Sequence, residues 1–135
     1  MRQGEVVELE IPSAPEYVSI VRQAVAGIAR RMSFGDNQIE DLKIAVGEAC
    51  TNAIKHGCPG DPSRHVLVRC TVHEHGLQVD VTNSIANCAS PTVPDAPDLS
   101  KEGGLGLYLM RQLVDEVDLC WDTDTATVKL TKMLR

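Results

Sequence analysis

Aromatic residues make up only 3% of the 135 residues of this sequence. A core with so few of them has to be built from leucine, valine, isoleucine and alanine, and the hydrophobic fraction of 43% supplies these. No apolar run approaches the ~18 residues that a transmembrane helix needs, and residues 1–5 contain no apolar stretch typical of a secretory signal. We therefore expect one soluble, intracellular domain over residues 1–135, located in the cytoplasm.

Positive charge is also scarce. Thirteen Lys and Arg residues stand against nineteen Asp and Glu residues, which gives a net charge of −6. No segment forms the basic stripe that a nucleic-acid-binding surface requires. We therefore expect neither a nucleic acid nor a membrane as partner, whereas a basic protein partner is compatible with this charge.

The cysteines are scattered and odd in number, and no two of them form a C-x-x-C pair: Cys50, Cys58, Cys70, Cys88 and Cys120. This pattern predicts reduced thiols and argues against a disulfide framework. A zinc site built from Cys70, His73 and His75 is the alternative. Strand alternation would place Cys70 on the opposite face from the two histidines, which disfavours that site.

The apolar pattern changes period along the chain and predicts the order β-α-α-β-β-loop-α-β-β. Strands are predicted over residues 6–11, 66–72, 77–81, 117–121 and 126–134. Helices are predicted over residues 17–32, from a cap at Asp36 or Asn37 to Gly57, and over residues 105–114. Residues 84–102 contain three prolines and no periodicity, which is typical of a long functional loop such as an active-site lid. We expect an α/β (α+β) two-layer sandwich with a mixed, mostly antiparallel sheet and helices on one face.

One predicted helix carries a polar stripe. Glu48, Asn52 and the pair Lys55 and His56 follow one another at spacings of three and four, which brings them to one helical face. A carboxylate, an amide and a cation on one face would suit a metal-bound phosphate. The alternatives are a solvated pair of Glu48 and Asn52, and a His56 that bonds a carbonyl at the helix end.

A glycine-rich segment leads into the helix predicted over residues 105–114: Gly103, Gly104, Leu105, Gly106 and Leu107. Glycine permits close backbone approach, and a helix start offers unpaired N–H groups to an anion. Taken alone, such a segment often does no more than begin a helix.

These two motifs together resemble those of a known ATPase superfamily. Residues 48–57 resemble the N box of the superfamily of gyrase, heat-shock chaperone, sensor histidine kinase and mismatch-repair proteins, and residues 103–110 resemble its second glycine box. The run Asp115-Glu116-Val117 and the short chain narrow the resemblance to the anti-sigma factor serine/threonine protein kinase family. The resemblance spans essentially the whole chain.

The resemblance implies a histidine-kinase-like ATPase fold and a transferase that regulates transcription in stress response or sporulation. Such a protein sequesters a sigma factor, and it uses ATP and Mg²⁺ to phosphorylate a serine of an anti-anti-sigma factor. The resemblance also implies a homodimer, formed through the first strand and helix.

The resemblance further assigns roles to single residues. Glu48 would be the general base for the substrate serine, Asn52 would ligate Mg²⁺, and Lys55 would lie near the phosphates. Gly104, Gly106 and Leu107 would direct backbone N–H groups along the phosphate chain, and Thr127 would hold adenine through its hydroxyl. The full nucleotide-binding set is Asn52, Lys55, Asn83, Lys101, Gly103, Gly104, Leu105, Gly106, Leu107 and Thr127.

The chain departs from the family at the first glycine box. The family has D-x-G-x-G there, and the matching residues 83–87 read Asn-Ser-Ile-Ala-Asn, so that Asn83 stands in place of the aspartate that accepts from the adenine amino group. Lys101 is the only candidate contact to the γ-phosphate before the second glycine box. A non-catalytic interaction module of the same fold is therefore an alternative. A histidine-kinase catalytic domain is disfavoured because the helix predicted over residues 17–32 contains no histidine.

Overall fold

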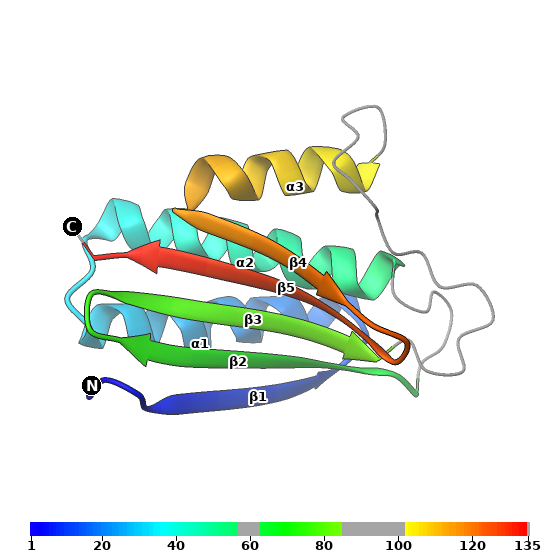
Figure 1. Cartoon of the computed structure of the whole chain (residues 1–135), viewed down its shortest axis with the longest axis horizontal. Coiled ribbons are helices and arrows are strands. Elements are labelled where there is room, and N and C mark those ends of the chain that lie inside the picture. Colours follow the sequence, from blue (N-terminus) through cyan, green and yellow to red (C-terminus); the bar gives the residue numbers. More distant parts are fainter. Residues whose placement is uncertain (57–62, 85–101, 135) are drawn as a thin grey trace.

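A computed structural model of the chain describes residues 1–56, 63–84 and 102–134. Its helices and strands follow one another in the predicted order (Figure 1). Their bounds are β1 Val6–Pro12, a 3-10 turn Pro15–Tyr17, α1 Val18–Arg31, α2 Asp36–His56, β2 His65–His73, β3 Gly76–Ser84, α3 Glu102–Leu113, β4 Glu116–Trp121 and β5 Thr125–Met133. The lid predicted over residues 84–102 lies almost wholly outside the described residues.

The five strands form one sheet in the order β1-β2-β3-β5-β4. Each of its four strand pairings is antiparallel, so the described sheet has no parallel pair and the predicted mixed sheet is wrong in that respect. The helices lie on one side of the sheet, with α2 between α1 and α3 (Figure 1). The predicted two-layer α/β sandwich is confirmed.

The core lies between the sheet and the helices. On β2, Val66, Val68, Cys70 and Val72 are buried toward the helices, and the alternate residues Leu67, Arg69 and Thr71 face the other side. Leu42 and Val46 of α2 are fully buried against this surface. Phe34 is the only aromatic residue among the buried core residues of the described structure, which agrees with a core built from aliphatic side chains.

Two helices begin elsewhere than the sequence predicts. Asp36 is the first residue of α2, and Gly35 precedes it; the Gly35 N–H donates to Oε1 of Gln38 at 3.0 Å, the second half of a capping box. Asp36 still lies in the first turn, where its charge complements the helix dipole. Helix α3 begins at Glu102, three residues before its predicted start at Leu105.

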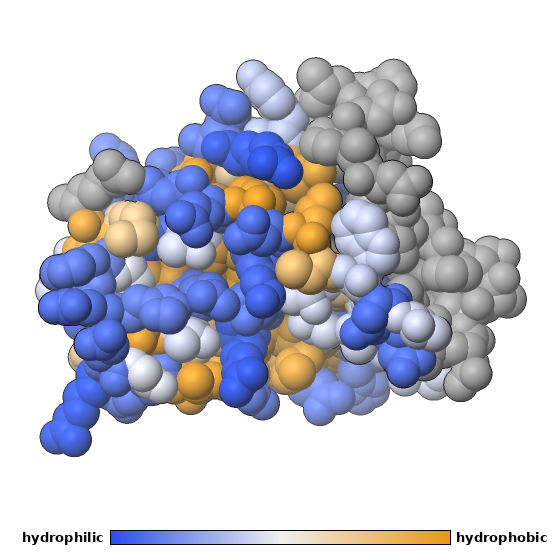
Figure 2. Space-filling view, in the orientation of Figure 1, coloured by the Kyte–Doolittle hydropathy of each residue, from blue (hydrophilic) through white to orange (hydrophobic). Residues whose placement is uncertain are grey.

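The face of the sheet away from the helices is polar and carries a row of alternating charges across all five strands. The register aligns Glu8 with Arg69, Arg69 with Asp80, Asp80 with Lys129, and Lys129 with Asp118. Arg69 Nε lies 3.4 Å from Glu8 Oε1. Figure 2 shows a hydrophilic band that crosses the strands on this face. Opposite charges therefore face one another at every strand boundary along the row.

Candidate functional site

The candidate site forms where α3 crosses α2 at Gly106. A Cβ atom added to Gly106 would lie 2.9 Å from Oε2 of Glu48, 3.3 Å from Nδ2 of Asn52 and 3.5 Å from its Oδ1. The backbone of α3 therefore lies directly on the carboxylate and the amide, with no side chain in between. The structure thus brings together the polar stripe of α2 and the glycine segment of α3, which are about fifty residues apart in the sequence.

Two residues of the polar stripe, Glu48 and Asn52, place side-chain oxygen atoms at the edge of the core, where they can act as ligands. Glu48 and Asn52 are partly buried, whereas Ala45 and Ala49, on neighbouring faces of the same helix, are fully buried. One helical turn separates Glu48 from Asn52, so their side chains point the same way. A carboxylate and an amide oxygen in this position can orient a hydroxyl and ligate a hard cation.

The other predicted residues of α2 and of the loop before α3 are described less fully. Lys55 lies in the last turn of α2, three residues after Asn52, and its side chain is exposed. His56 is the last residue of α2, and its side chain lies outside the described part. Lys101 lies outside the described residues altogether.

Helix α3 corrects part of the predicted phosphate cradle. Because α3 begins at Glu102, the N–H groups without an intrahelical acceptor are those of its first turn, which includes Gly103 and Gly104. Gly106 and Leu107 lie in the second turn, where N–H groups are bonded within the helix, and the Leu107 side chain is 3% exposed in the core. Gly106 therefore lets the backbone of α3 lie close to α2, and the Leu107 side chain packs in the core.

Asn83 and Thr127 lie on opposite faces of the sheet, which corrects the prediction that both of them hold adenine. Asn83, near the end of β3, is buried on the helix-covered side, and its neighbour across the ladder on β5 is Ala126. Thr127 instead pairs with Thr82, and the two hydroxyls are 2.9 Å apart. Because side chains alternate along a strand, Thr127 points to the open face, away from Glu48.

Sequence reasoning missed Arg22 of α1. A Cβ atom on Gly47 would lie 2.5 Å from Arg22 Nε and 2.9 Å from its Cζ, so the guanidinium covers the turn of α2 that carries Glu48. The signal in the sequence is Gly47 itself, because a glycine in a helix interior costs stability unless something approaches closely.

Neither buried cysteine is a nucleophile. Burial raises the pKa of the Cys50 thiol to about 12, despite the nearby charge of Arg22. Burial and the Asp80 carboxylate raise the pKa of Cys70 to about 11. Both thiols stay protonated at neutral pH and behave as apolar core groups. Cys70 is buried and His73 exposed, so they face opposite ways as expected.

The described residues contain no cluster of three His, Cys, Asp or Glu side chains that could hold a metal ion alone. A cation at Asn52 would therefore depend on oxygen atoms of a bound ligand and on water. This is the usual arrangement for Mg²⁺, which binds one or two protein oxygens together with phosphate oxygens. The hard oxygen donors of Glu48 and Asn52, beside a helix start, fit such a metal.

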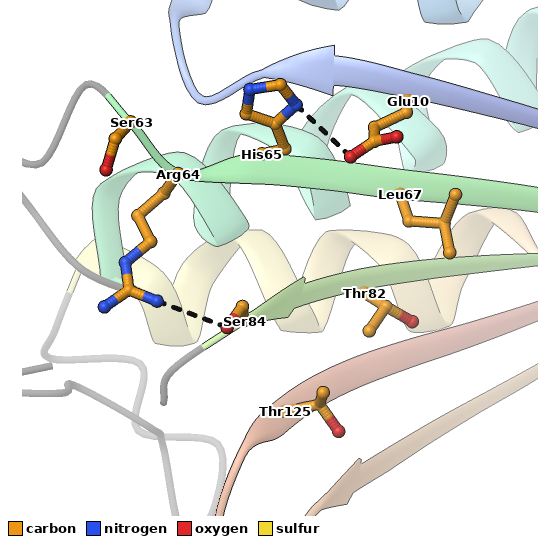
Figure 3. Close-up of a pocket in the computed structure, with 8 residues that line it drawn as sticks. All are labelled: Glu10, Ser63, Arg64, His65, Leu67, Thr82, Ser84 and Thr125. Atoms are coloured by element: carbon orange, nitrogen blue, oxygen red, sulfur yellow. Dashed lines mark hydrogen bonds and ion pairs between the residues drawn. The ribbon is translucent and has the colours of Figure 1, made fainter. Parts of the chain in front are cut away.

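A separate hollow of about 490 Å³ opens on the polar face of the sheet (Figure 3). His65 Nδ1 lies 3.2 Å from Glu10 Oε1, and Arg64 Nη1 donates to Ser84 Oγ at 3.2 Å. The hollow is lined by Glu10, Ser63, Arg64, His65, Leu67, Thr82, Ser84 and Thr125. It shares no residue with the Glu48 site and lies across the sheet from it, so it takes no part in that chemistry.

Within the described ranges, no helix is both long enough and apolar enough to span a bilayer.

Comparison with known proteins agrees with this geometry. The sequence profile of the histidine kinase-like ATPase domain matches residues 11–132. The serine-protein kinase RsbW of Bacillus licheniformis is 42% identical, and the match covers 98% of this chain and 88% of the relative. The serine-protein kinase RsbW of Bacillus subtilis is 40% identical over 97% of this chain and 87% of its own length.

A solved structure supports the fold. The crystal structure of the RsbU and RsbW domains of a Mycobacterium tuberculosis protein matches 96% of this chain with a TM-score of 0.72 and 18% identity, and the match spans 32% of that longer chain. Helix α2 with its polar stripe, the glycine contact of α3 and the full-length sequence matches lead to one conclusion. The chain belongs to the histidine kinase-like ATPase domain family and, within it, to the serine-protein kinase RsbW family.

Proposed function

We propose that the chain is an anti-sigma factor that sequesters a sigma factor and uses Mg-ATP to phosphorylate a serine of an anti-anti-sigma antagonist. The observation that carries this proposal is the contact of Gly106 with Glu48 and Asn52. That contact puts a candidate base and a candidate metal ligand against the second turn of α3, next to the first turn with its free N–H groups. The names of the relatives, serine-protein kinase RsbW, supply the reaction class.

Glu48 acts as the general base in this proposal. Its carboxylate would accept the hydroxyl proton of the substrate serine as that oxygen attacks the γ-phosphorus. The bond from the γ-phosphorus to the oxygen that bridges to the β-phosphate would break, so that ADP leaves and the phosphate stays on the serine.

Asn52 holds the metal through its amide oxygen, and the first turn of α3 binds phosphate through its free N–H groups. When bound, Mg²⁺ neutralises phosphate charge and fixes the geometry of the transferred group. Lys55, on the next turn of α2, adds positive charge on the same side. Phosphoryl transfer requires positioning and charge neutralisation above all, and these groups supply both.

The test compares Glu48→Gln with Glu40→Gln. Glu40 lies on the exposed face of the same helix, where its carboxylate contacts Lys43 at 3.3 Å, so it is a matched control. We expect Glu48→Gln to bind ATP with Mg²⁺ as the wild type does but to lose transfer to the antagonist, with Glu40→Gln unchanged. Retained transfer by Glu48→Gln would remove Glu48 from the mechanism. If millimolar Mg-ATP does not raise the melting temperature of the wild type, the proposed kinase activity is refuted.

One observation favours a second candidate, a non-catalytic module of the same fold that regulates a sigma factor by binding alone. Among the described residues of β3 and β5, the part of the site that would hold adenine offers only the Asn83 amide, because its ladder neighbour is Ala126 and Thr127 points away. Fewer polar groups at that end predict weaker nucleotide binding. The same thermal measurement separates the two candidates, because the module would bind its protein partners without any nucleotide-dependent stabilisation.

We further infer that the protein works in the cytoplasm as a homodimer, in stress response or sporulation. Strand β1 is an edge of the sheet, and Val6, Val7 and Ile20 nearby are 42, 40 and 51% exposed, which suits a self-association surface. Light scattering after size-exclusion chromatography tests the dimer, and Val7→Lys should shift it to monomer if β1 takes part.

A further inference from the structure

Asn83 is the only polar residue in the buried class among the described residues, with 9% of its surface exposed. Val79 and Val81, which precede it on β3 and point the same way, are fully or almost fully buried. Its ladder neighbours on that face are Val66 on β2 and Ala126 on β5, neither of which has a polar side chain. Asn83 therefore stands in an apolar environment on the helix-covered side.

The amide of Asn83 has no side-chain hydrogen bond anywhere in the described part of the chain. Buried polar side chains in folded proteins are almost always paired, because an unpaired buried amide costs free energy. An unpaired one at the end of a strand indicates a group whose partner lies outside the described residues, and a bound ligand is such a partner. The side chain offers one acceptor and two donor hydrogens, so its ligand must present a polar edge.

The position of Asn83 suits the base of a nucleotide whose phosphates lie at α3. Figure 1 shows that the end of β3, the end of α2 and the start of α3 lie at the same end of the molecule. Asn83 and the Glu48 site are on the same, helix-covered side of the sheet. This step rests on the proposed nucleotide-binding function and concerns which base the site takes.

An amide and a carboxylate form different hydrogen bonds with the edge of a purine. The Asn83 oxygen can accept from a 6-amino group while its NH₂ donates to ring N1. After a half-turn of the amide, the NH₂ donates to a 6-oxo group while the oxygen accepts from N1–H. Both edges are thus met by two hydrogen bonds. A carboxylate only accepts, so a carboxylate oxygen that faces position 6 bonds a 6-amino group and repels a 6-oxo oxygen.

We propose that Asn83 makes the site permissive toward the purine, so that it takes 6-oxopurine triphosphates as well as ATP. The unpaired buried amide between Val66 and Ala126 carries this assignment. Asn83 is then the residue that determines base specificity, and it acts by direct contact with the base.

The test measures dissociation constants by calorimetry for the magnesium complexes of ATP and of inosine triphosphate, which differ at position 6 and in the N1 proton. We expect the wild type to bind both within about threefold. Asn83→Asp should still bind ATP. Its dissociation constant for inosine triphosphate, divided by that for ATP, should be at least ~10-fold larger than the same ratio in the wild type. Asn83→Ala should weaken both nucleotides with little change in the ratio.

Thr82→Val is the matched control, because Thr82 precedes Asn83 on β3 but points to the open face. It should leave the ratio unchanged. Tenfold or greater preference of the wild type for ATP, or an unchanged ratio in Asn83→Asp, would overturn the assignment and leave the kinase proposal standing. Failure of the wild type to bind either nucleotide at millimolar concentration would overturn both. Circular dichroism melting shows which variants are folded, and the wild-type ratio decides the assignment even if Asn83→Asp does not fold.

Discussion

The substitution Gly106→Ala should lower activity without lowering stability. Gly106 lies inside α3, where alanine is favoured over glycine by about 0.5–1 kcal/mol because the unfolded chain loses less entropy. Its added carbon, however, would lie 2.9 Å from Glu48 Oε2, whereas ordinary contacts begin at 3.4 Å. The carboxylate would therefore have to move by about 0.5 Å, the difference between these two distances.

A displacement of that size matters for a general base. Proton transfer needs heavy atoms within about 2.6–3.2 Å, and a misplacement of ~1 Å can cost about 100-fold in rate. For the smaller shift of Glu48 we expect a loss of roughly 10-fold in the rate of antagonist phosphorylation. The unfolding free energy should stay equal to that of the wild type or rise, because the end of a flexible side chain can yield at low cost.

Gly27→Ala is the control. Gly27 lies inside α1, and a Cβ atom there would meet no other atom within 4 Å. This variant should gain about 0.5–1 kcal/mol in urea unfolding and keep its full phosphorylation rate. Phosphorylation is followed with labelled ATP and the anti-anti-sigma protein of the same genome. A Gly106→Ala variant that phosphorylates within twofold of the wild type would refute the reasoning, because the carboxylate would then not need the space.

Two further predictions concern stability. The thiols of Cys50 and Cys70 have pKa values raised to about 12 and about 11 by burial, so the unfolded chain ionises first as the pH rises above about 9. The contribution of these thiols to the unfolding free energy should therefore be constant below pH 9 and fall above it by up to ~1.4 kcal/mol per pH unit for each thiol. Cys50→Ala should reduce the slope above pH 9, and an unchanged slope would contradict the assignment. Lys129→Glu would put a third carboxylate between Asp80 and Asp118, and we expect it to cost about 1–2 kcal/mol in urea unfolding. That loss should shrink in 1 M salt, and a salt-independent loss would show that packing and not charge is responsible.

The sequence predicted those features that depend on periodicity. Alternation along β2 and the three-four spacing of α2 gave the elements, their order and the side of each that is buried. The stripe of Glu48 and Asn52 was visible because both residues lie in one regular helix, where spacing alone determines the face.

Features that depend on tertiary contact or on a single residue of register were predicted less well. The adenine-binding role of Thr127 came from the family resemblance alone, and in the structure Thr127 pairs with Thr82 on the open face. A shift of one residue along a strand turns a side chain over, and the pattern of β5 does not fix its register against β3. The contact of Arg22 with Gly47 joins two helices and has no local signal beyond the glycine.

The strand order also has a consequence for how the chain folds. Strands β2 and β3 are joined by the two residues Glu74 and His75, and β4 and β5 by the three residues 122–124, so each hairpin can form early. The central pairing of β3 with β5 joins residues up to about 57 positions apart, Gly76 with Met133, and must wait for loop closure over that length. The two hairpins should consequently collapse first, and their union, which also carries α3 onto α2, should be the slow step that completes the catalytic surface.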